Sequence, residues 1–282
     1  MNVSYSTRLD KSNLLALLSD IDEQSAGARS GLKRLWEKLD FDQAQRNVAR
    51  LQARIVKAFR KGQSNKVKVL QGLLTRSLSA RILAVKRVTS SRGARTPGID
   101  GQHWKTPASK MAGALSLWKK GYKAQPLRRV NIAKPGSKKK RPLGIPVIRD
   151  RAMQALHLMA LDPISEAGAD ENSYGFRKHR STHDAIDQAF IVLGRKNSAT
   201  WVLDADIAGC FDNICHNWML QNIPMDQTIL REWLKCGYVE TKGRFFPTTA
   251  GTPQGGIASP CLCNMVLDGL EKVVKTAVKS GR

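Results

Sequence analysis

The segment from Trp201 to Ile214, WVLDADIAGCFDNI, constrains the fold of this 282-residue chain more than any other feature. Its apolar start, Trp201–Leu203, is typical of a buried strand, and the carboxylate of Asp206 follows shortly after it. Phe211 comes five residues later and is followed directly by a further acid. The pattern predicts a strand that carries a carboxylate to the edge of a sheet, with a bulky aromatic side chain close by.

A strand-end carboxylate beside an aromatic ring is a common arrangement in nucleotidyl-transfer sites. Such sites hold two Mg²⁺ ions, roughly 3.5–4 Å apart, that clamp the attacking and leaving oxygens. One carboxylate cannot hold both ions, and the sequence contains no Asp-Asp dipeptide. Asp204 is expected on the same strand face as Asp206, so spacing alone does not decide which of them binds metal. A core strand that merely ends in acids is the structural alternative.

The charge of the chain is large and unevenly distributed. Lys and Arg number 47 against 23 Asp and Glu, which gives a formal net charge of +24. Residues 41–95 contain fourteen basic side chains and one acid, and residues 105–141 contain twelve basic side chains and no acid. In residues 1–40, six basic and six acidic side chains cancel. Two local basic surfaces of this kind indicate a polyanionic partner, with a generally basic solvated protein as the alternative.

A helix that begins at Phe41 is predicted to carry the first basic surface. Apolar side chains recur on one face, and basic side chains recur on another at steps of three and four residues: Arg46, Arg50, Arg54, Lys57 and Lys61. One face can pack while the other contacts phosphates. A second helix is expected from Asn65 to about Val88, after a break at Gly62.

Helices dominate the first part of the sequence and strand patterns come later, which favours an α+β fold. Residues 126–134 and 142–146 are predicted to form a hairpin around a lysine-rich loop. Helices are expected over 151–161 and 182–193, near 216–221 and 227–236, and from Pro260 to Val278. Residues 173–177 are expected to form a loop, and residues 244–249 one arm of a second hairpin.

Two further groups have the chemistry to bind a nucleotide. Lys134 and Arg141 flank the hairpin loop and can reach a triphosphate, with Arg suited to bidentate contact, although a solvated charged loop is the alternative. Gln254 lies in the segment GTPQGG, where a proline and two glycines surround it. This turn predicts a close approach of backbone to ligand, with the glutamine amide presented from it.

Taken in order, these pieces resemble the reverse transcriptases of group II introns. The resemblance rests on six successive blocks: TPGIDG from Thr96, RPLGIP from Arg141, DRAMQ from Asp150, SYGFR from Ser173, DIAGCFD from Asp206 and TPQGG from Thr252. It covers the chain from about residue 41 onward. It implies a right-hand polymerase fold preceded by a basic N-terminal extension that binds template and intron RNA.

The resemblance also implies domains and roles. Residues 41–95 are expected to form the extension, 96–198 the fingers and 199–282 part of the palm. Residues 1–40 lie outside the resemblance, and their polar composition predicts an N-terminal segment of one or two helices or a partly mobile one. Asp206 matches the first catalytic carboxylate, and Ile207 the carbonyl that contacts a metal. Phe211 matches the gate that excludes a ribose 2′-OH. The expected dNTP ligands are Lys134, Arg141 and Gln254, and the expected RNA contacts are Arg46, Arg50, Arg54, Lys57, Lys61 and Arg177.

The chain departs from the family in one important respect. The family carries a Tyr-x-Asp-Asp hairpin after the glutamine block, and this sequence reaches Arg282 without it. The Mg²⁺ site is therefore expected to be incomplete, the chain to be inactive alone, and the Asp206 strand to form an exposed apolar edge. A second polypeptide could supply the remainder of palm and thumb. The alternatives are an RNA-binding module without catalysis, half of a split enzyme, or an inactive remnant.

The cysteines and the hydropathy pattern predict the cellular compartment of the protein. The five cysteines lie in apolar or helix-like surroundings and are expected to be reduced thiols of a cytoplasmic protein. The N-terminus lacks the basic and apolar regions of a signal peptide. No apolar stretch approaches the roughly 18 residues that a membrane span requires. The sequence therefore predicts no membrane association.

Overall fold

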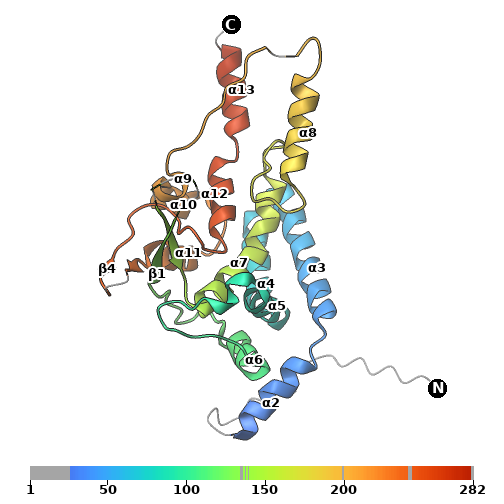
Figure 1. Ribbon diagram of the computed structural model, residues 1–282. Coiled ribbons are helices and arrows are strands. Elements are labelled where there is room, and N and C mark those ends of the chain that lie inside the picture. Colours follow the sequence, from blue (N-terminus) through green and yellow to red (C-terminus); the bar gives the residue numbers. More distant parts are fainter. Residues whose placement is uncertain are drawn as a thin grey trace, which may run out of the picture.

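The computed structural model describes residues 26–133, 136, 138, 140–198, 200–240 and 243–280. It has a mixed α/β fold in which helices predominate (Figure 1). The helices are α2 Ala26–Glu37, α3 Phe41–Arg60, α4 Ser64–Arg76, α5 Leu78–Ser90, η1 Arg92–Arg95, α6 Pro107–Ser116, α7 Ile148–Ala167, α8 Thr182–Leu193, α9 Cys210–Asn213, α10 His216–Asn222, α11 Gln227–Lys235, α12 Ser259–Leu267 and α13 Leu270–Ser280. The strands are β1 Leu127–Ala133, β2 Lys140–Ile145, β3 Tyr238–Val239 and β4 Phe245–Phe246.

Helices α3, α4, α5 and α7 form the body of the molecule. Most of α7 is buried, including Met153, Leu156 and Leu161, and α3, α4 and α5 all contact it. Some polar side chains buried along α7 bind partners from distant segments. Arg151 donates to the carbonyl oxygens of residues 93 and 96, at 2.7 and 2.8 Å. Helix α7 therefore ties together segments far apart in the sequence.

Local capping chemistry explains where the basic helices begin and end. The predicted start of α3 is confirmed, because the Asp40 side chain accepts a hydrogen bond from Gln43 N at 2.8 Å. The expected single helix from Asn65 to Val88 is wrong. Ser77 leaves the helical conformation with ψ 137° and caps α5 through a hydrogen bond from Ala80 N, so the segment forms two helices.

The predicted hairpin is present and forms one edge of the small sheet. Strands β1 and β2 pair antiparallel, with Val130 opposite Leu143, and the sheet order is β2-β1-β3-β4. Strand β1 pairs in parallel with β3, and β3 pairs antiparallel with β4. The expected hairpin arm at 244–249 is thus confirmed as a short strand. The loop 173–177 and the helices expected near 216 and 227 are also confirmed.

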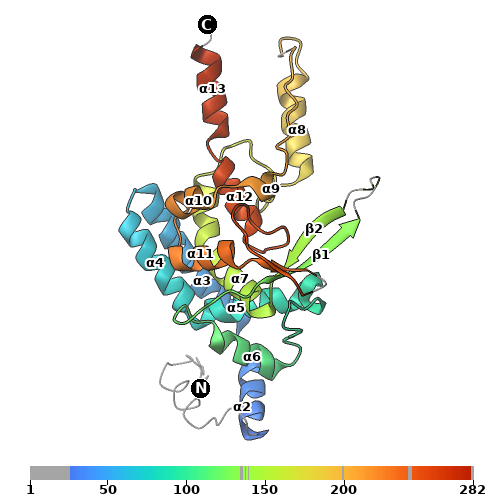
Figure 2. The same cartoon turned by 90° about the vertical axis from the view of Figure 1, so that its left-hand side faces the viewer.

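Two helices project from one end of the molecule, as Figures 1 and 2 both show. One is α8, which has the predicted bounds. The other is α13. The single closing helix expected from Pro260 to Val278 is wrong, because the chain leaves the helix at Asp268 (ψ 132°) and Gly269 follows with φ 96°. A positive φ favours glycine, so this break is encoded locally.

Candidate functional site

A cavity of about 320 Å³ lies between the β1–β2 hairpin, α9 and the loop before Gln254. Phe211 and Gln254, predicted separately from the sequence, both line it. Its other walls come from Leu127, Arg129, Pro142, Gly144, Asp212, Trp233, Leu234, Cys236, Tyr238 and residues 247–253. Its volume is within the range of small-molecule sites.

Backbone hydrogen bonds hold the two predicted residues in place. Thr252 N donates to Phe211 O at 2.7 Å, and Gly144 N donates to Gln254 O at 2.9 Å. Gly251 has φ 81°, and a Cβ there would lie 2.6 Å from Phe211 O. Only glycine permits this approach of the two chain segments, so the glycine before TPQGG has a structural reason.

The turn around Gln254 is also fixed from α7. Gln154 accepts a hydrogen bond from Ile257 N at 2.8 Å, and Ser259 Oγ donates to Pro253 O at 2.8 Å. The sequence block that contains Gln154 was recognised, but this role was not predicted. A buried glutamine within an apolar helix is the signal that points to such a bond.

Arg129 is a cavity residue that sequence reasoning missed. Its guanidinium carbon lies 3.7 Å from the centroid of the Tyr238 ring, and its Nε is buried without a hydrogen-bond partner. A guanidinium held in this way presents a cation to a ligand in the cavity. The strand alternation around residues 126–134 could have indicated that this side chain faces inward.

Of the two predicted hairpin cations, the structure describes Arg141 alone, and this residue does not line the cavity. Arg141 is exposed on β2, opposite Ile132, and is not among the described residues that line the cavity. Lys134 lies outside the described residues. Of the four predicted dNTP contacts, the structure therefore brings Phe211 and Gln254 together.

The predicted buried strand at Trp201–Leu203 is wrong. Described residues 201–207 have no regular secondary structure, and Trp201 and Leu203 are 92% and 90% exposed. A strand is stable only when a neighbouring strand pairs with it. None of the four described strands pairs with this segment. The predicted apolar edge strand is likewise not formed, although its side chains are exposed.

The carboxylates of this segment do not assemble a metal site. Asp206 is exposed, and about half of the Ile207 side chain is exposed. Within the part of the chain that the structure describes, no group of three or more His, Cys, Asp or Glu side chains lies close enough to hold a metal ion. The described residues do not by themselves fit a Mg²⁺ pair.

The two faces of α3 are confirmed. Ala44, Val48, Ile55 and Ala58 are buried. The predicted basic residues are all exposed: Arg46, Arg50, Arg54, Lys57 and Lys61. Arg46 lies 3.9 Å from Asp40, an exposed contact of small energetic weight. The remaining four have no ion-pair partner among the described residues, so their charge faces solvent.

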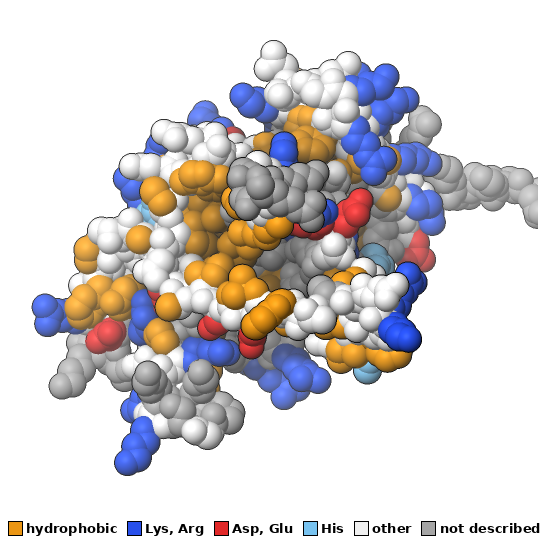
Figure 3. Space-filling view, turned by 90° about the horizontal axis from the view of Figure 1, so that it is seen from above, with side chains coloured by type: hydrophobic (Ala, Val, Ile, Leu, Met, Phe, Trp, Pro, Cys, Tyr) orange, Lys and Arg blue, Asp and Glu red, His pale blue; other side chains and the backbone are white. Residues whose placement is uncertain are grey.

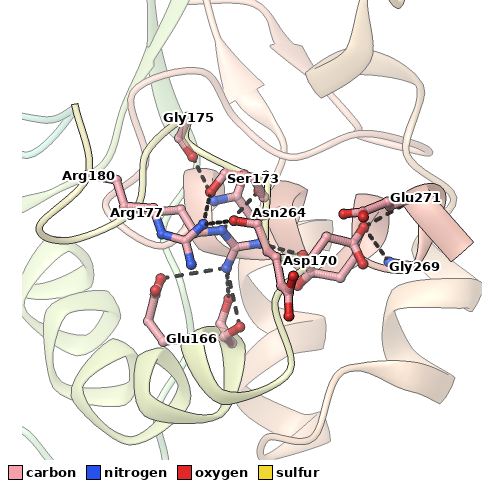
Figure 4. A network of polar contacts seen from close by, with 12 residues as sticks. Glu166, Asp170, Ser173, Gly175, Arg177, Arg180, Asn264, Gly269 and Glu271 are labelled. Atoms are coloured by element: carbon pink, nitrogen blue, oxygen red, sulfur yellow. Dashed lines mark hydrogen bonds and ion pairs between the residues drawn. The ribbon is translucent and has the colours of Figure 1, made fainter. Parts of the chain in front are cut away.

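The predicted position of Arg177 at the RNA-binding surface is wrong. Its side chain is fully buried and forms ion pairs with Asp268 and with Glu166, the latter at 3.5 Å (Figure 4). It also donates to the Ser173 hydroxyl at 3.0 Å and the Ser165 carbonyl at 3.2 Å. Carboxylates and carbonyls that surround a guanidinium occupy its donors, so Arg177 joins α7 to the end of α12 and its donors do not face solvent.

Comparison with known protein families identifies two matching regions. Residues 36–117 match the N-terminal domain of reverse transcriptase, and residues 132–280 match the reverse transcriptase (RNA-dependent DNA polymerase) family. The chain therefore belongs to the reverse transcriptase family.

Two curated relatives illustrate the similarity, and one of them is named as a group II intron-encoded protein. The group II intron-encoded protein LtrA of Lactococcus lactis subsp. cremoris is 39% identical over 201 residues, which are 68% of this chain and 33% of LtrA. Protein YkfC of Escherichia coli (strain K12) is 34% identical over 212 residues, 71% of this chain and 55% of YkfC. The chain thus spans a third to about half of these relatives.

Family membership supports general statements about ligands. Reverse transcriptases bind RNA and nucleotides and depend on Mg²⁺. Among the described helices, none is both long enough and apolar enough to cross a membrane.

Proposed function

We propose that this chain is the fingers and part of the palm of a group II intron-type reverse transcriptase. In this proposal residues 41–95 and 105–141 bind template and intron RNA, residues 96–198 are the fingers and 199–282 the palm portion. Residues 1–40 precede these parts as an N-terminal segment. The observation that supports the proposal is that Phe211 and Gln254 both line one cavity.

The incoming dNTP occupies this cavity in the proposed arrangement. The Phe211 ring lies at the sugar and excludes a 2′-OH, while the Gln254 amide contacts the nucleotide from the turn. Arg129 adds a cation at the wall, and Lys134 and Arg141 reach the triphosphate from the hairpin. Asp206 and the Ile207 carbonyl are the metal ligands that this chain contributes.

The remaining carboxylates come from a further polypeptide segment in this proposal. Apolar side chains spread over the end of the molecule that carries α8 and α13, as Figure 3 shows from above. Phe190 of α8 and Val273 of α13 are 76% and 65% exposed. A segment that packs on this apolar surface would pair with residues 201–207 and complete the ligand set around Asp206.

Primer extension tests the proposal. The chain is incubated with poly-rA, oligo-dT, dTTP and Mg²⁺, alone and with a separately expressed C-terminal part of a related enzyme. We expect synthesis only in the mixture, and its loss with Asp206→Ala. Synthesis by the chain alone above the Asp206→Ala control contradicts the incomplete site. Absence of synthesis in the mixture contradicts a competent dNTP site.

RNA binding without catalysis is the second candidate, and the exposed cations of α3 favour it. If about six to ten phosphates are contacted, RNA affinity should fall roughly 10³–10⁵-fold between 50 and 200 mM salt. A flat salt response contradicts both candidates. Strong salt dependence together with an inactive mixture leaves this second function.

A further inference from the structure

A second cavity, of about 760 Å³, shares no residue with the first. It lies between α4, the loop after α6, the middle of α7 and the start of α11, elements that lie close together in Figure 2. Neither the reverse transcriptase motifs nor the proposed dNTP contacts include the residues that line it. Its size is sufficient for a nucleotide.

The lining of this cavity is strongly basic. Lys68, Arg76, Lys119 and Lys120 line it against a single acid, Asp226. Lys119 forms an ion pair with Asp226, which leaves three exposed cations without an ion-pair partner among the described residues. An excess of free cations around a concave site favours a phosphate-containing ligand.

The cavity wall includes an exposed aromatic ring, that of Trp118. The Trp118 side chain is 49% exposed and lines the cavity. The Arg81 guanidinium lies 4.1 Å from the centre of its ring and is itself buried. The arginine covers one face of the indole and fixes its orientation, so the opposite face is available for a flat ligand. Nucleobases stack on such faces whatever their sequence.

Two polar groups in the wall lack partners. Gln227 donates through Nε2 to the carbonyls of Ile223 and Met225, and its Oε1 is buried without any partner. The two carbonyls fix the amide orientation, so Oε1 can only accept. His157 is buried against Trp233 and has no hydrogen bond among the described residues. Burial lowers the pKa of His157 to about 4, so the ring is neutral at physiological pH.

We infer that this second cavity binds an unpaired nucleotide of single-stranded RNA. Its base stacks on Trp118 and meets Gln227 and His157, while Lys68, Arg76 and Lys120 contact the flanking phosphates. An acidic peptide would satisfy the cations but carries no flat base to stack on the indole face. This inference rests on the proposed RNA binding, which it extends to a particular site.

Fluorescence anisotropy with a labelled 12-nucleotide single-stranded RNA tests the inference. For Trp118→Ala we expect an affinity loss of roughly 5- to 150-fold, and for Trp118→Phe, which keeps an aromatic face, a much smaller loss. Trp218→Ala is the matched control, because Trp218 is exposed on α10 outside the cavity. An abasic oligomer of equal length should bind wild type and Trp118→Ala alike. Circular dichroism checks that each variant folds.

Each outcome has a distinct meaning. If the chain binds no RNA, the proposed function itself fails. If RNA binds with strong salt dependence but equally to wild type and Trp118→Ala, the RNA function stands and the second cavity is excluded. If poly-glutamate competes as well as RNA of equal charge, the cavity recognises charge alone and the inference is overturned. Lys68→Ala should reduce the salt slope by about one if it contacts a phosphate.

Discussion

The helical body and the projecting end of this protein both contain amphipathic helices, but their apolar faces are buried in the body and exposed at the projecting end. In the body, the apolar faces of α3 and α4 are covered, and Ile55 and Leu74 are completely buried. At the projecting end, the apolar residues of α8 and α13 remain exposed. Both regions contain amphipathic helices with capped ends. The difference lies in what surrounds them.

An amphipathic face is stabilised only by a partner element. In the body α7 supplies that partner, because its buried side chains contact α3, α4 and α5 together. Around α8 and α13 the described residues provide no equivalent cover. An apolar helix face therefore predicts where packing can occur, but not which element will pack on it.

The largest expected effect is at the joint between the two regions. Arg177→Met should lower the free energy of unfolding by about 3–5 kcal/mol, because it leaves the partly buried carboxylates of Glu166 and Asp268 unpaired. Urea unfolding measures the change. Arg54→Met, on the exposed face of α3, is the control and should change it by less than about 0.5 kcal/mol. Equal effects would contradict the buried role of Arg177.

A matched pair of leucines tests the comparison directly. Leu74→Ala should lower the free energy of unfolding by about 2–5 kcal/mol, because its side chain is fully buried between helices. Leu270→Ala, on the exposed face of α13, should change it by less than about 0.5 kcal/mol. Denaturant unfolding of both variants measures the two changes in free energy. A large effect at Leu270 would mean that the projecting end is packed in solution.

The buried imidazole of His157 should make the body sensitive to acid. Its pKa is lowered to about 4 by burial, with Asp226 and Lys119 as the nearby charges. Stability from this residue is therefore complete above its unfolded pKa of about 6.5 and is lost as the pH falls toward 4, by at most about 3 kcal/mol. His157→Gln should flatten this part of the stability–pH curve. An unchanged slope in that variant would assign the acid sensitivity to other groups.

The smallest effect on stability is expected at the projecting end. Phe190→Ser combined with Val273→Ser should change the free energy of unfolding by less than about 1 kcal/mol, because both side chains are exposed. The same variant should self-associate less, since it removes exposed apolar surface. Light scattering and denaturant unfolding measure the two properties. A large loss of stability would show that the two apolar faces are covered in solution.

Much of the fold could be predicted because its signals are local. The hairpin alternation, the Asp40 cap of α3 and the bounds of α8 each depend on a few adjacent residues. Helix α6 was missed although its sequence contains a signal, since Thr106 and Ser109 form a capping box around Pro107. The breaks at Ser77 and Gly269 were missed because their apolar periodicity continues on both sides.

Some residues of the candidate site could be predicted from local sequence, and others could not. Phe211 and Gln254 were identified from local sequence, and the structure brings them to one cavity. Arg129 and the exposed ring of Trp118 could not be found in this way, because their partners Tyr238 and Arg81 are remote in sequence. Arg177 was misassigned because an arginine in a loop is usually exposed, and only distant carboxylates made burial favourable.

Local sequence was enough to predict the family, helix α3, the hairpin and the turn around Gln254, because each signal comes from residues close together in the chain. Three features became known from the folded structure: Arg177 is buried between α7 and α12, residues 201–207 form no strand, and Trp118 lines a second basic cavity. Strand pairing, burial of charge and the shape of a cavity depend on which distant elements meet. Local sequence patterns do not encode those contacts.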